Sequence, residues 1–438
     1  MDLSALERRV VEAVDANELL ADLRALVAIP STGGSDAEHD VQAWCAQRLA
    51  QLGADVDHWR IDVEALTARP DFPGQEVIRR EAYGCVGSLA GEGTPALVLC
   101  GHVDVVPPGN LEAWPDRDPW TLRTSEGAMA GRGTCDMKGG LAAIFGAVAA
   151  LNRAGVRLRR PLAVHAVVGE EDGGLGAFAT LLRGHRGDAC VIAEPTAGTI
   201  IPANAGSLTF QLDVPGQAAH GSTRTLGVSA VDKLSVLLGA LRELEAQRNA
   251  HPDPWLAHLD LPYPLSVGIV RAGDWASTVP DRALAHGRYG VRLDESVDAA
   301  RLEFEAAVAR ACAADPWLAA HPARVEWPGG VFASGRLPEQ HTLTAELAGA
   351  LTALGGPAPA VLGAPYGSDL RLYIAAGVPT LQFGPGDIRY AHALDEHVTL
   401  AEIESAARAF ALLALRRCGA TRPGTANGAC AGSENHFQ

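Results

Sequence analysis

Three apolar segments of this chain each end in histidine or carboxylate side chains, and this shared ending constrains the fold most strongly. The segments are PALVLCGHVDVV at 95–106, PLAVHAVVGEED at 161–172 and ACVIAEPT at 189–196. The first two are separated by GGLAAIFGAVAALNRAG at 139–155, which has helical periodicity. Apolar strands that alternate with helices predict an α/β fold with a mostly parallel central sheet flanked by helices. Ligands of such sheets gather outside the carboxyl ends of the strands, where these polar residues fall.

The pattern changes near residue 206 and returns near residue 331. Between these points the candidate strands alternate apolar and polar residues, and long helical patterns occur at 227–247 and 297–314. We therefore expect an inserted α+β domain with two helices on an antiparallel sheet. The predicted divisions are a main domain at 1–206 and 331–420, the inserted domain at 207–330 and a disordered tail at 421–438.

Charge and cysteine content exclude some classes of partner. The chain has 36 basic and 52 acidic residues, whereas nucleic acids and anionic membranes select basic surfaces. No apolar run reaches the roughly 18 residues that span a bilayer, and the N-terminus lacks the features of a secretory signal. Eight cysteines are scattered without a CxxC pair. These features predict a cytoplasmic protein that binds neither nucleic acid nor membrane.

The polar residues at the strand ends and in two glycine-rich loops have the composition of a metal site. They are His102, Asp136, the adjacent pair Glu170 and Glu171, Glu194 and His392. Imidazole and carboxylate ligands without a thiolate pair suit a zinc-type catalytic site for one or two metals. Asp104 lies two residues after His102, on the same side of a strand, so we expect it to accept a hydrogen bond from the His102 ring.

Six motifs resemble, in order, those of one enzyme family. They are GHVDVVPPG, GRGTCDMKGG, GEEDGGLG, AEPT, GQAAHGS, and FGPG followed by AHALDEHV. Over roughly residues 10–418 the chain resembles the co-catalytic dinuclear zinc amidohydrolases and metallopeptidases. This is the family of acetylornithine deacetylase, succinyl-diaminopimelate desuccinylase, aminoacylase and glutamate carboxypeptidase. The resemblance implies that the main domain is catalytic and binds metal, and that the inserted domain is a lid or dimerisation domain.

The resemblance also implies a ligand set. His102 and Glu194 would bind one metal ion, and Glu171 and His392 would bind the other. Asp136 would bridge the two ions. The expected cofactors are two Zn²⁺ per chain, with Co²⁺ or Mn²⁺ as alternatives.

Further catalytic roles follow from the same resemblance. Glu170 would be the general base and Asp104 would orient His102. His220, in GQAAHGS, would stabilise the oxyanion at the metals of the partner chain in a homodimer. The peptide bond Asp136–Met137 is expected to be cis. Asp172 receives no such role and is expected to be solvated.

The substrate-binding residues are less well specified. Ser277 in WASTVPD stands where many relatives carry asparagine, and it could still donate a hydrogen bond. Arg288 and Arg292 in GRYGVR are alternative clamps for a substrate carboxylate, because a planar guanidinium binds carboxylate bidentately; both could equally be surface residues. Gly384 and Gly386 are expected to line the same pocket with backbone groups.

The resemblance therefore predicts an amide hydrolase that deacylates a small N-acyl amino acid, as acetylornithine deacetylase does. A water activated by the metal ions would attack the amide carbonyl while Glu170 accepts its proton. The alternatives are a metallo-exopeptidase or dipeptidase, and a deformylase of a formylaminopyrimidine. A non-catalytic binding protein is disfavoured, because every predicted ligand position holds a competent residue.

Overall fold

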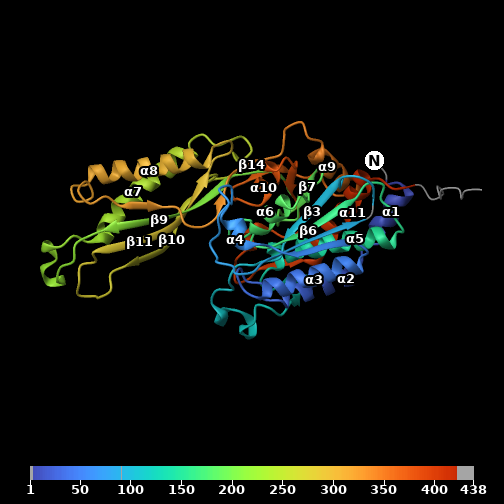
Figure 1. Cartoon of the computed structure of the whole chain (residues 1–438), viewed down its shortest axis with the longest axis horizontal. Helices are drawn as coiled ribbons and strands as arrows, with labels where there is room; N and C mark the ends of the chain where they lie inside the picture. The colour runs from blue at the N-terminus through green and yellow to red at the C-terminus, as the bar shows by residue number, and fades with distance from the viewer. Residues whose placement is uncertain (1–2, 90, 422–438) are drawn as a thin grey trace, which may run out of the picture.

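The structure of the chain is a computed structural model that describes residues 3–89 and 91–421. It has a larger lobe, which contains both ends of the described chain, and a smaller lobe at 206–332 that extends from it (Figure 1). The predicted disordered tail at 421–438 lies outside the described residues except for Thr421.

The larger lobe is built on a nine-stranded sheet. Its strands, in spatial order, are β1 (Asp55–Arg60), β2 (Tyr83–Leu89), β6 (Leu162–Val167), β3 (Leu97–His102), β7 (Cys190–Ile192), β16 (Thr380–Gln382), β8 (Ile200–Asn204) and β14 (Gly335–Arg336), with β15 (Val361–Ala364) beside β8. The central strands β6, β3, β7 and β16 are parallel, whereas β1, β2 and β14 pair antiparallel towards the edges. Every residue of β3 and β6 is buried, which explains their continuous apolar sequences.

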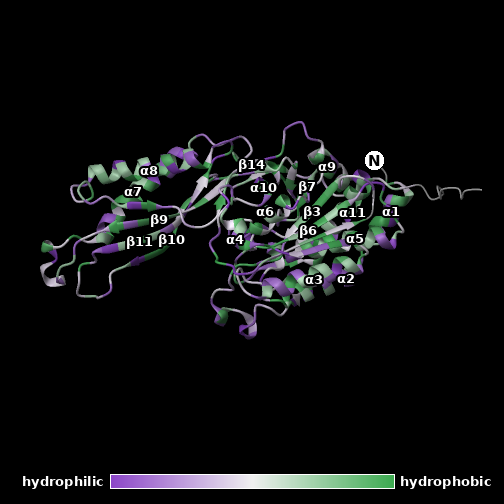
Figure 2. Ribbon diagram, viewed as in Figure 1, coloured by the Kyte–Doolittle hydropathy of each residue, from purple (hydrophilic) through white to green (hydrophobic). Residues whose placement is uncertain are grey.

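Helices flank this sheet (Figure 1). They are α1 (Ala5–Glu12), α2 (Ala16–Val27), α3 (Ala37–Gln51), α4 (Val63–Thr67), α5 (Gly139–Arg153), α6 (Leu175–Leu182), α9 (Leu343–Ala353), α10 (Leu370–Ala375) and α11 (Leu400–Cys418). The segment Thr134–Arg153, which includes α5, is long and apolar enough to cross a membrane, but its most apolar stretch of 18 residues is entirely buried in the protein. Hydrophobic residues are concentrated in the central strands and in α5 and α11 (Figure 2), which form the core of the lobe. The predicted α/β fold with a central parallel sheet is confirmed.

The smaller lobe is an antiparallel sheet covered by two helices, as predicted. Its strands are β10 (Leu265–Ala272), β11 (Arg282–Val291), β9 (Gly206–Pro215) and β12 (Arg324–Glu326) in spatial order, with β13 (Val331–Phe332) also paired to β9. The helices are α7 (Ala230–Asn249) and α8 (Val297–Ala314), which share a separate hydrophobic core with the sheet. A third, small sheet of β17 (His397–Thr399), β5 (Ala128–Ala130) and β4 (Arg123–Ser125) belongs to the larger lobe.

Candidate metal centre

The carboxyl ends of three neighbouring parallel strands meet at one edge of the larger sheet. β3 ends at His102, and β6 ends three residues before Glu170. β7 ends two residues before Glu194. Because these strands are adjacent and parallel, their polar ends converge as the sequence predicts.

Two further side chains reach this edge from outside the strands. Asp136 lies in the kinked turn Thr134–Lys138, where the peptide bond Asp136–Met137 is cis, as expected. Asp136 Oδ1 lies 3.0 Å from His102 Nε2, and Asp136 Oδ2 lies 3.5 Å from His392 Nε2. His392 Nε2 also lies 3.1 Å from Glu171 Oε2. The two carboxylate oxygens of Asp136 therefore face two different histidines.

The donor atoms form two overlapping groups. One group contains His102, Glu170 and Glu194, and the other contains His102, Asp136 and Glu171. Within each group all donor atoms lie within 4.8 Å of one another. The tertiary structure thus brings the predicted ligands together, and it places Glu170 beside them.

The electrostatics of this cluster favour bound cations. Burial raises the pKa of the Glu170 and Glu194 carboxyl groups, and neighbouring negative charges raise it further. Burial also opposes ionisation of Asp136, but hydrogen bonds from the two histidines hold its pKa well below the usual range. Burial lowers the pKa of His392, yet the adjacent carboxylates outweigh this effect and raise it to about 11. Divalent cations would relieve the repulsion among these buried carboxylates, so the donor set fits such ions.

Asp104 contacts His102 through a different group from the one expected. Its backbone carbonyl, not its carboxylate, accepts the hydrogen bond from His102 Nδ1, at 2.9 Å. Asp104 Oδ1 is 3.8 Å from that nitrogen. The carboxylate instead accepts hydrogen bonds from the backbone N–H groups of Gly169, Glu170 and Glu171, at 2.8, 3.3 and 3.2 Å. Asp104 therefore orients the ring through its main chain and fixes the turn of the two glutamates through its side chain.

Asp172 is buried, so the prediction that it is solvated is wrong. Its side chain accepts two hydrogen bonds of 2.8 Å from Arg79 Nη1 and one of 2.9 Å from the backbone N–H of Val77. Arg79 also donates to Glu38 of α3, from Nη2 at 2.8 Å and from Nε at 2.9 Å. A buried guanidinium thus ties the turn after Glu171 to α3. The sequence gives no signal of this contact, because Arg79 is 93 residues away from Asp172.

A second buried ion pair, between Arg132 and Glu396, was also not predicted. Arg132 Nη1 lies 2.5 Å from Glu396 Oε2. Glu396 Oε1 accepts hydrogen bonds from the backbone N–H groups of Cys135 and Asp136, at 3.0 and 3.1 Å, and Arg132 Nη2 donates to the carbonyl of His392 at 3.3 Å. The pair holds the two backbone segments that present Asp136 and His392. Arg132 and Glu396 themselves lie within the motifs GRGTCDMKGG and AHALDEHV, so their position next to the predicted ligands was a signal that could have identified them.

A cavity of about 420 Å³ lies over the cluster, between the two lobes. The residues that line it are Glu76, Asp136, Glu170, Glu171, Glu194, Ser207, Thr209, Arg288, Phe332, Tyr366, Gly367, Ser368, Ile388, Ala391 and His392. Arg288 reaches it, as expected of a carboxylate clamp, and donates from Nε to Ser207 Oγ at 2.7 Å and from Nη2 to the carbonyl of Pro365 at 2.9 Å. Glu76, Ser207, Thr209 and Phe332 were not predicted, and no motif marks them.

Three predicted substrate-binding residues lie elsewhere in the larger lobe or beside α8. Arg292 follows the end of β11, and its Nη1 lies 3.8 Å from Glu303 of α8. Gly384 and Gly386 are buried and are not among the residues that line the cavity. A Cβ on Gly384 would lie 2.3 Å from the carbonyl oxygen of Ala193, so this glycine permits a close backbone approach beneath Glu194. None of these three residues is among those that line the cavity, so of the two alternative clamps only Arg288 reaches it.

His220 and Ser277 lie close together, because His220 forms a backbone bridge with Thr278. The loops that carry them, at 216–228 and 273–281, lie at the end of the smaller lobe that is farthest from the larger lobe (Figure 1). The backbone N–H of Gly221 donates to the Ser277 carbonyl at 2.6 Å. The His220 side chain is exposed, and its Nδ1 lies 2.7 Å from Ser222 Oγ. Neither residue lines the cavity of its own chain.

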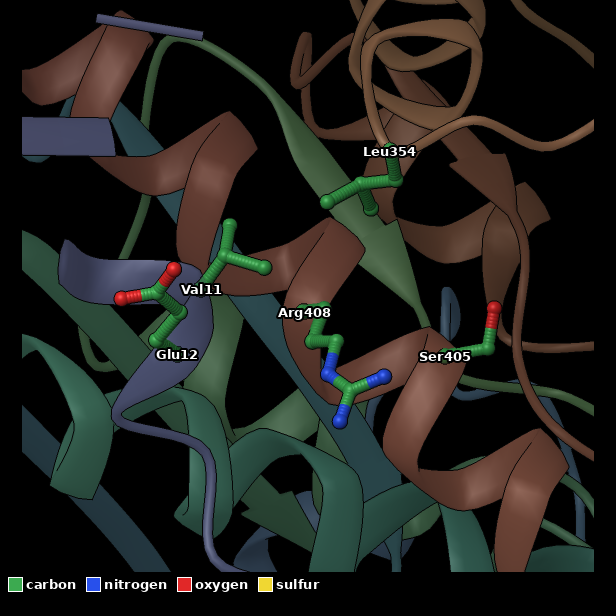
Figure 3. A pocket seen from close by; sticks show the side chains of 5 residues that line it. All are labelled: Val11, Glu12, Leu354, Ser405 and Arg408. Atoms are coloured by element: carbon green, nitrogen blue, oxygen red, sulfur yellow. The ribbon is translucent and has the colours of Figure 1, made fainter. Parts of the chain in front are cut away.

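Another hollow lies between α1, the end of α9 and α11 (Figure 3). Val11, Glu12, Leu354, Ser405 and Arg408 line it. It contains one carboxylate and one guanidinium and no histidine or cysteine, so it offers no group of metal ligands or paired catalytic residues.

Most of the sequence matches a known family. The model of peptidase family M20/M25/M40 matches residues 98–416. The chain belongs to this family. It is similar to the N-formyl-4-amino-5-aminomethyl-2-methylpyrimidine deformylase of Halalkalibacterium halodurans, at 27% identity over 92% of this chain and 95% of the relative. It is also similar to the acetylornithine deacetylase of Proteus mirabilis, at 27% identity over 87% of this chain and 92% of the relative.

Solved structures of two dipeptidases share the fold. The dipeptidase Dug1p of Saccharomyces cerevisiae aligns with a TM-score of 0.74 and 16% identity, over 94% of this chain and 98% of its own. Human carnosine dipeptidase 1 aligns with a TM-score of 0.73 and 16% identity, over 94% of this chain and 99% of its own. Membership of this family, together with the deformylase and deacetylase relatives, shows that the protein is a metal-dependent amidohydrolase.

Proposed function

We propose that this M20 enzyme removes the acyl group from a small, linear N-acyl amino acid with two Zn²⁺ ions bound at its cluster. The observation that carries this proposal is the Arg288 guanidinium, which lines the cavity next to the cluster. Among the described residues it bonds only to the neutral oxygens of Ser207 and Pro365. Burial lowers the pKa of Arg288, but arginine stays charged at neutral pH. A substrate carboxylate would compensate this charge through bidentate hydrogen bonds.

The same cluster would hold the two ions. His102 and Glu194 would bind one, Glu171 and His392 the other, and Asp136 both. This assignment is supported by the way Asp136 Oδ1 faces one histidine and Oδ2 faces the other. When bound, such ions supply Lewis acidity, which polarises a carbonyl and lowers the pKa of a water. Co²⁺ and Mn²⁺ would serve the same oxygen and nitrogen donors.

Glu170 would transfer the protons of the reaction. Its side chain is buried among the ligands, and the Asp104 carboxylate fixes its backbone. Burial and the charge of Glu194 raise the pKa of Glu170. Glu170 would accept a proton from the attacking water and deliver it to the leaving nitrogen.

We also propose a homodimer in which His220 completes the active site of the partner. His220 is exposed and does not line the cavity over the cluster of its own chain. β10 is an edge strand of the sheet in the described chain, and Ile269 and Val270 on it are 48% and 52% exposed. An exposed apolar edge strand favours pairing with another chain. In the dimer the His220 ring would donate a hydrogen bond to the oxyanion.

Deformylation is the second candidate, because a relative matched over 92% of this chain is named a formylaminopyrimidine deformylase. A substrate panel separates the candidates. Zinc-loaded enzyme is assayed with N-acetyl amino acids, the same compounds with the carboxylate replaced by a carboxamide, dipeptides, and N-formyl-4-amino-5-aminomethyl-2-methylpyrimidine. We expect N-acetyl amino acids to have the highest kcat/KM. Preference for the formylpyrimidine would replace our proposal with deformylation.

Arg288→Met tests the carboxylate contact directly. It should lower kcat/KM for the N-acetyl amino acid about 10- to 100-fold more than for its carboxamide, since a hydrogen bond to a charged group is lost. Arg292→Met is the matched control, because Arg292 lies beside Glu303 and outside the cavity. Equal losses for the carboxylate and the carboxamide in Arg288→Met would contradict the clamp.

A further inference from the structure

Glu76 places a second fixed charge in the cavity, opposite in sign to that of Arg288. It precedes β2 and belongs to no motif of the sequence, yet it lines the cavity with the catalytic carboxylates. Its side chain has a defined position. Thr209 Oγ1 of β9 donates to Glu76 Oε1 at 2.6 Å, and a Cβ on Gly329 would lie 2.6 Å from Glu76 Cγ and 2.9 Å from Oε1. The carboxylate is thus held between a hydroxyl and a glycine backbone.

The backbone around Glu76 is tied to both lobes. Its N–H donates to the carbonyl of Asp172 at 3.1 Å, next to the turn that carries the catalytic glutamates. Three residues earlier, the Pro73 carbonyl accepts a hydrogen bond of 2.6 Å from the N–H of Val331 in the smaller lobe. The carboxylate is therefore fixed relative to both the cluster and the strand that carries Thr209.

The Glu76 carboxylate has unused hydrogen-bonding capacity. An ionised carboxylate offers about four acceptor sites, and the Thr209 hydroxyl occupies one of them. Among residues 3–89 and 91–421, no lysine, arginine or histidine forms an ion pair with Glu76, whereas Arg60 pairs with the nearby Glu81. A negative charge that faces a cavity without a cationic partner attracts a cationic ligand group.

The register of the smaller sheet sets the spacing of the two charges. Arg288 is the cross-strand partner of Thr209, so both side chains project from the same face. Ser207, which accepts from Arg288, and Thr209, which donates to Glu76, are two residues apart on β9 and also share this face. Two residues of a strand span roughly 6.8 Å. The Arg288–Ser207 and Glu76–Thr209 contacts are thus separated by about this distance along β9.

We propose that Glu76 selects substrates that carry a protonated amine several bonds away from the carboxylate bound by Arg288. This inference rests on the proposed deacylation of an N-acyl amino acid and narrows its substrate to one with a basic side chain. The amine would donate to the free acceptor sites of Glu76, and the carboxylate would bind Arg288, so that the amide bond lies over the cluster.

The first test compares two substrates whose side chains have the same three carbons. Nα-acetylornithine carries the side-chain amine, and Nα-acetylnorvaline lacks it. Wild-type enzyme should prefer acetylornithine, and Glu76→Gln should reduce this ratio of kcat/KM about 10- to 100-fold, because a charge-assisted hydrogen bond is lost while the side-chain shape is kept. Glu112→Gln is the matched control, since Glu112 is an exposed residue paired with Arg117 and lies outside the cavity. An unchanged ratio in Glu76→Gln would overturn the inference, even if deacylation itself is confirmed.

The second test does not depend on turnover. Isothermal titration of the zinc-loaded protein with ornithine and norvaline should show tighter binding of ornithine, and Glu76→Gln should remove the difference. If no N-acetyl amino acid is hydrolysed, the proposed function fails, and the titration is repeated with 4-amino-5-aminomethyl-2-methylpyrimidine, an amine without a carboxylate. Binding that weakens in Glu76→Gln supports the amine contact in that case. Binding that is the same in both proteins overturns it.

Discussion

Replacing Arg79 with methionine should destabilise the larger lobe, because it leaves two buried carboxylates without their cation. The Arg79 guanidinium makes contacts of 2.8 Å with both oxygens of Asp172 and of 2.8–3.2 Å with both oxygens of Glu38. The side chains of Arg79 and Glu38 are 1% and 2% exposed. Removing one partner of such a buried pair typically costs about 3–5 kcal/mol. For a lobe of this size, 1 kcal/mol corresponds to roughly 2 °C in Tm, so we expect a loss of about 6–10 °C.

The loss of Tm in Arg79→Met should increase as the pH rises. Burial raises the pKa of the Glu38 carboxyl, and the Arg79 guanidinium opposes that rise. Without Arg79 the folded-state pKa of Glu38 rises further above its ordinary value of 4.5. An acid whose pKa is higher in the folded state binds more protons there, so stability falls as pH rises through the folded-state pKa. The difference in Tm between the wild type and Arg79→Met should therefore be larger at pH 8 than at pH 6.

Differential scanning calorimetry at both pH values, with the same saturating zinc concentration, measures this effect. Arg60→Met is the matched control: it breaks the exposed pair with Glu81, whose side chains are 63% and 44% exposed. Exposed pairs contribute no more than about 1 kcal/mol, so this variant should lose at most about 2 °C. If Arg79→Met loses no more than Arg60→Met, or if its deficit shrinks at pH 8, the stabilising role given to Arg79 is wrong.

Two further predictions concern catalysis. Metal analysis should find about two ions per chain in the wild type and in Glu170→Ala, whereas Glu171→Ala should lose metal. The kcat of Glu170→Ala should fall about 10²–10⁴-fold, because proton transfer fails. The reverse pattern would mean that the adjacent glutamates are assigned the wrong way round. Mixing Glu170→Ala with His220→Ala subunits should restore part of the activity, because a mixed dimer has one site with both residues intact. Subunit exchange shown by mass spectrometry without recovered activity would mean that His220 does not act across the dimer.

The sequence by itself determined the α/β fold, the presence of the inserted lobe and the residue types of the metal cluster. Each of these depends on local features. β3 and β6 are buried on both faces, so they appear in the sequence as continuous apolar runs. The polar residues at their ends mark one edge of the sheet, independently of the other segments of the chain. Buried and half-buried residues alternate along the first part of β9, and this alternation distinguishes the strand of the inserted lobe from β3 and β6.

The tertiary structure alone decided how those residues are held. Arg288 lines the cavity and Arg292 does not, because β11 ends at Val291 and the strand periodicity that would align the two arginines stops there. From the sequence, the Asp104 carboxylate was expected to contact the His102 ring and Asp172 was expected to be solvated. Their partners lie 65 and 93 residues away, and a hydrogen bond between such distant segments exists only when the whole lobe is packed. Local sequence specifies which side chain stands at each strand end, whereas the contacts that orient it come from chain segments that only folding brings together.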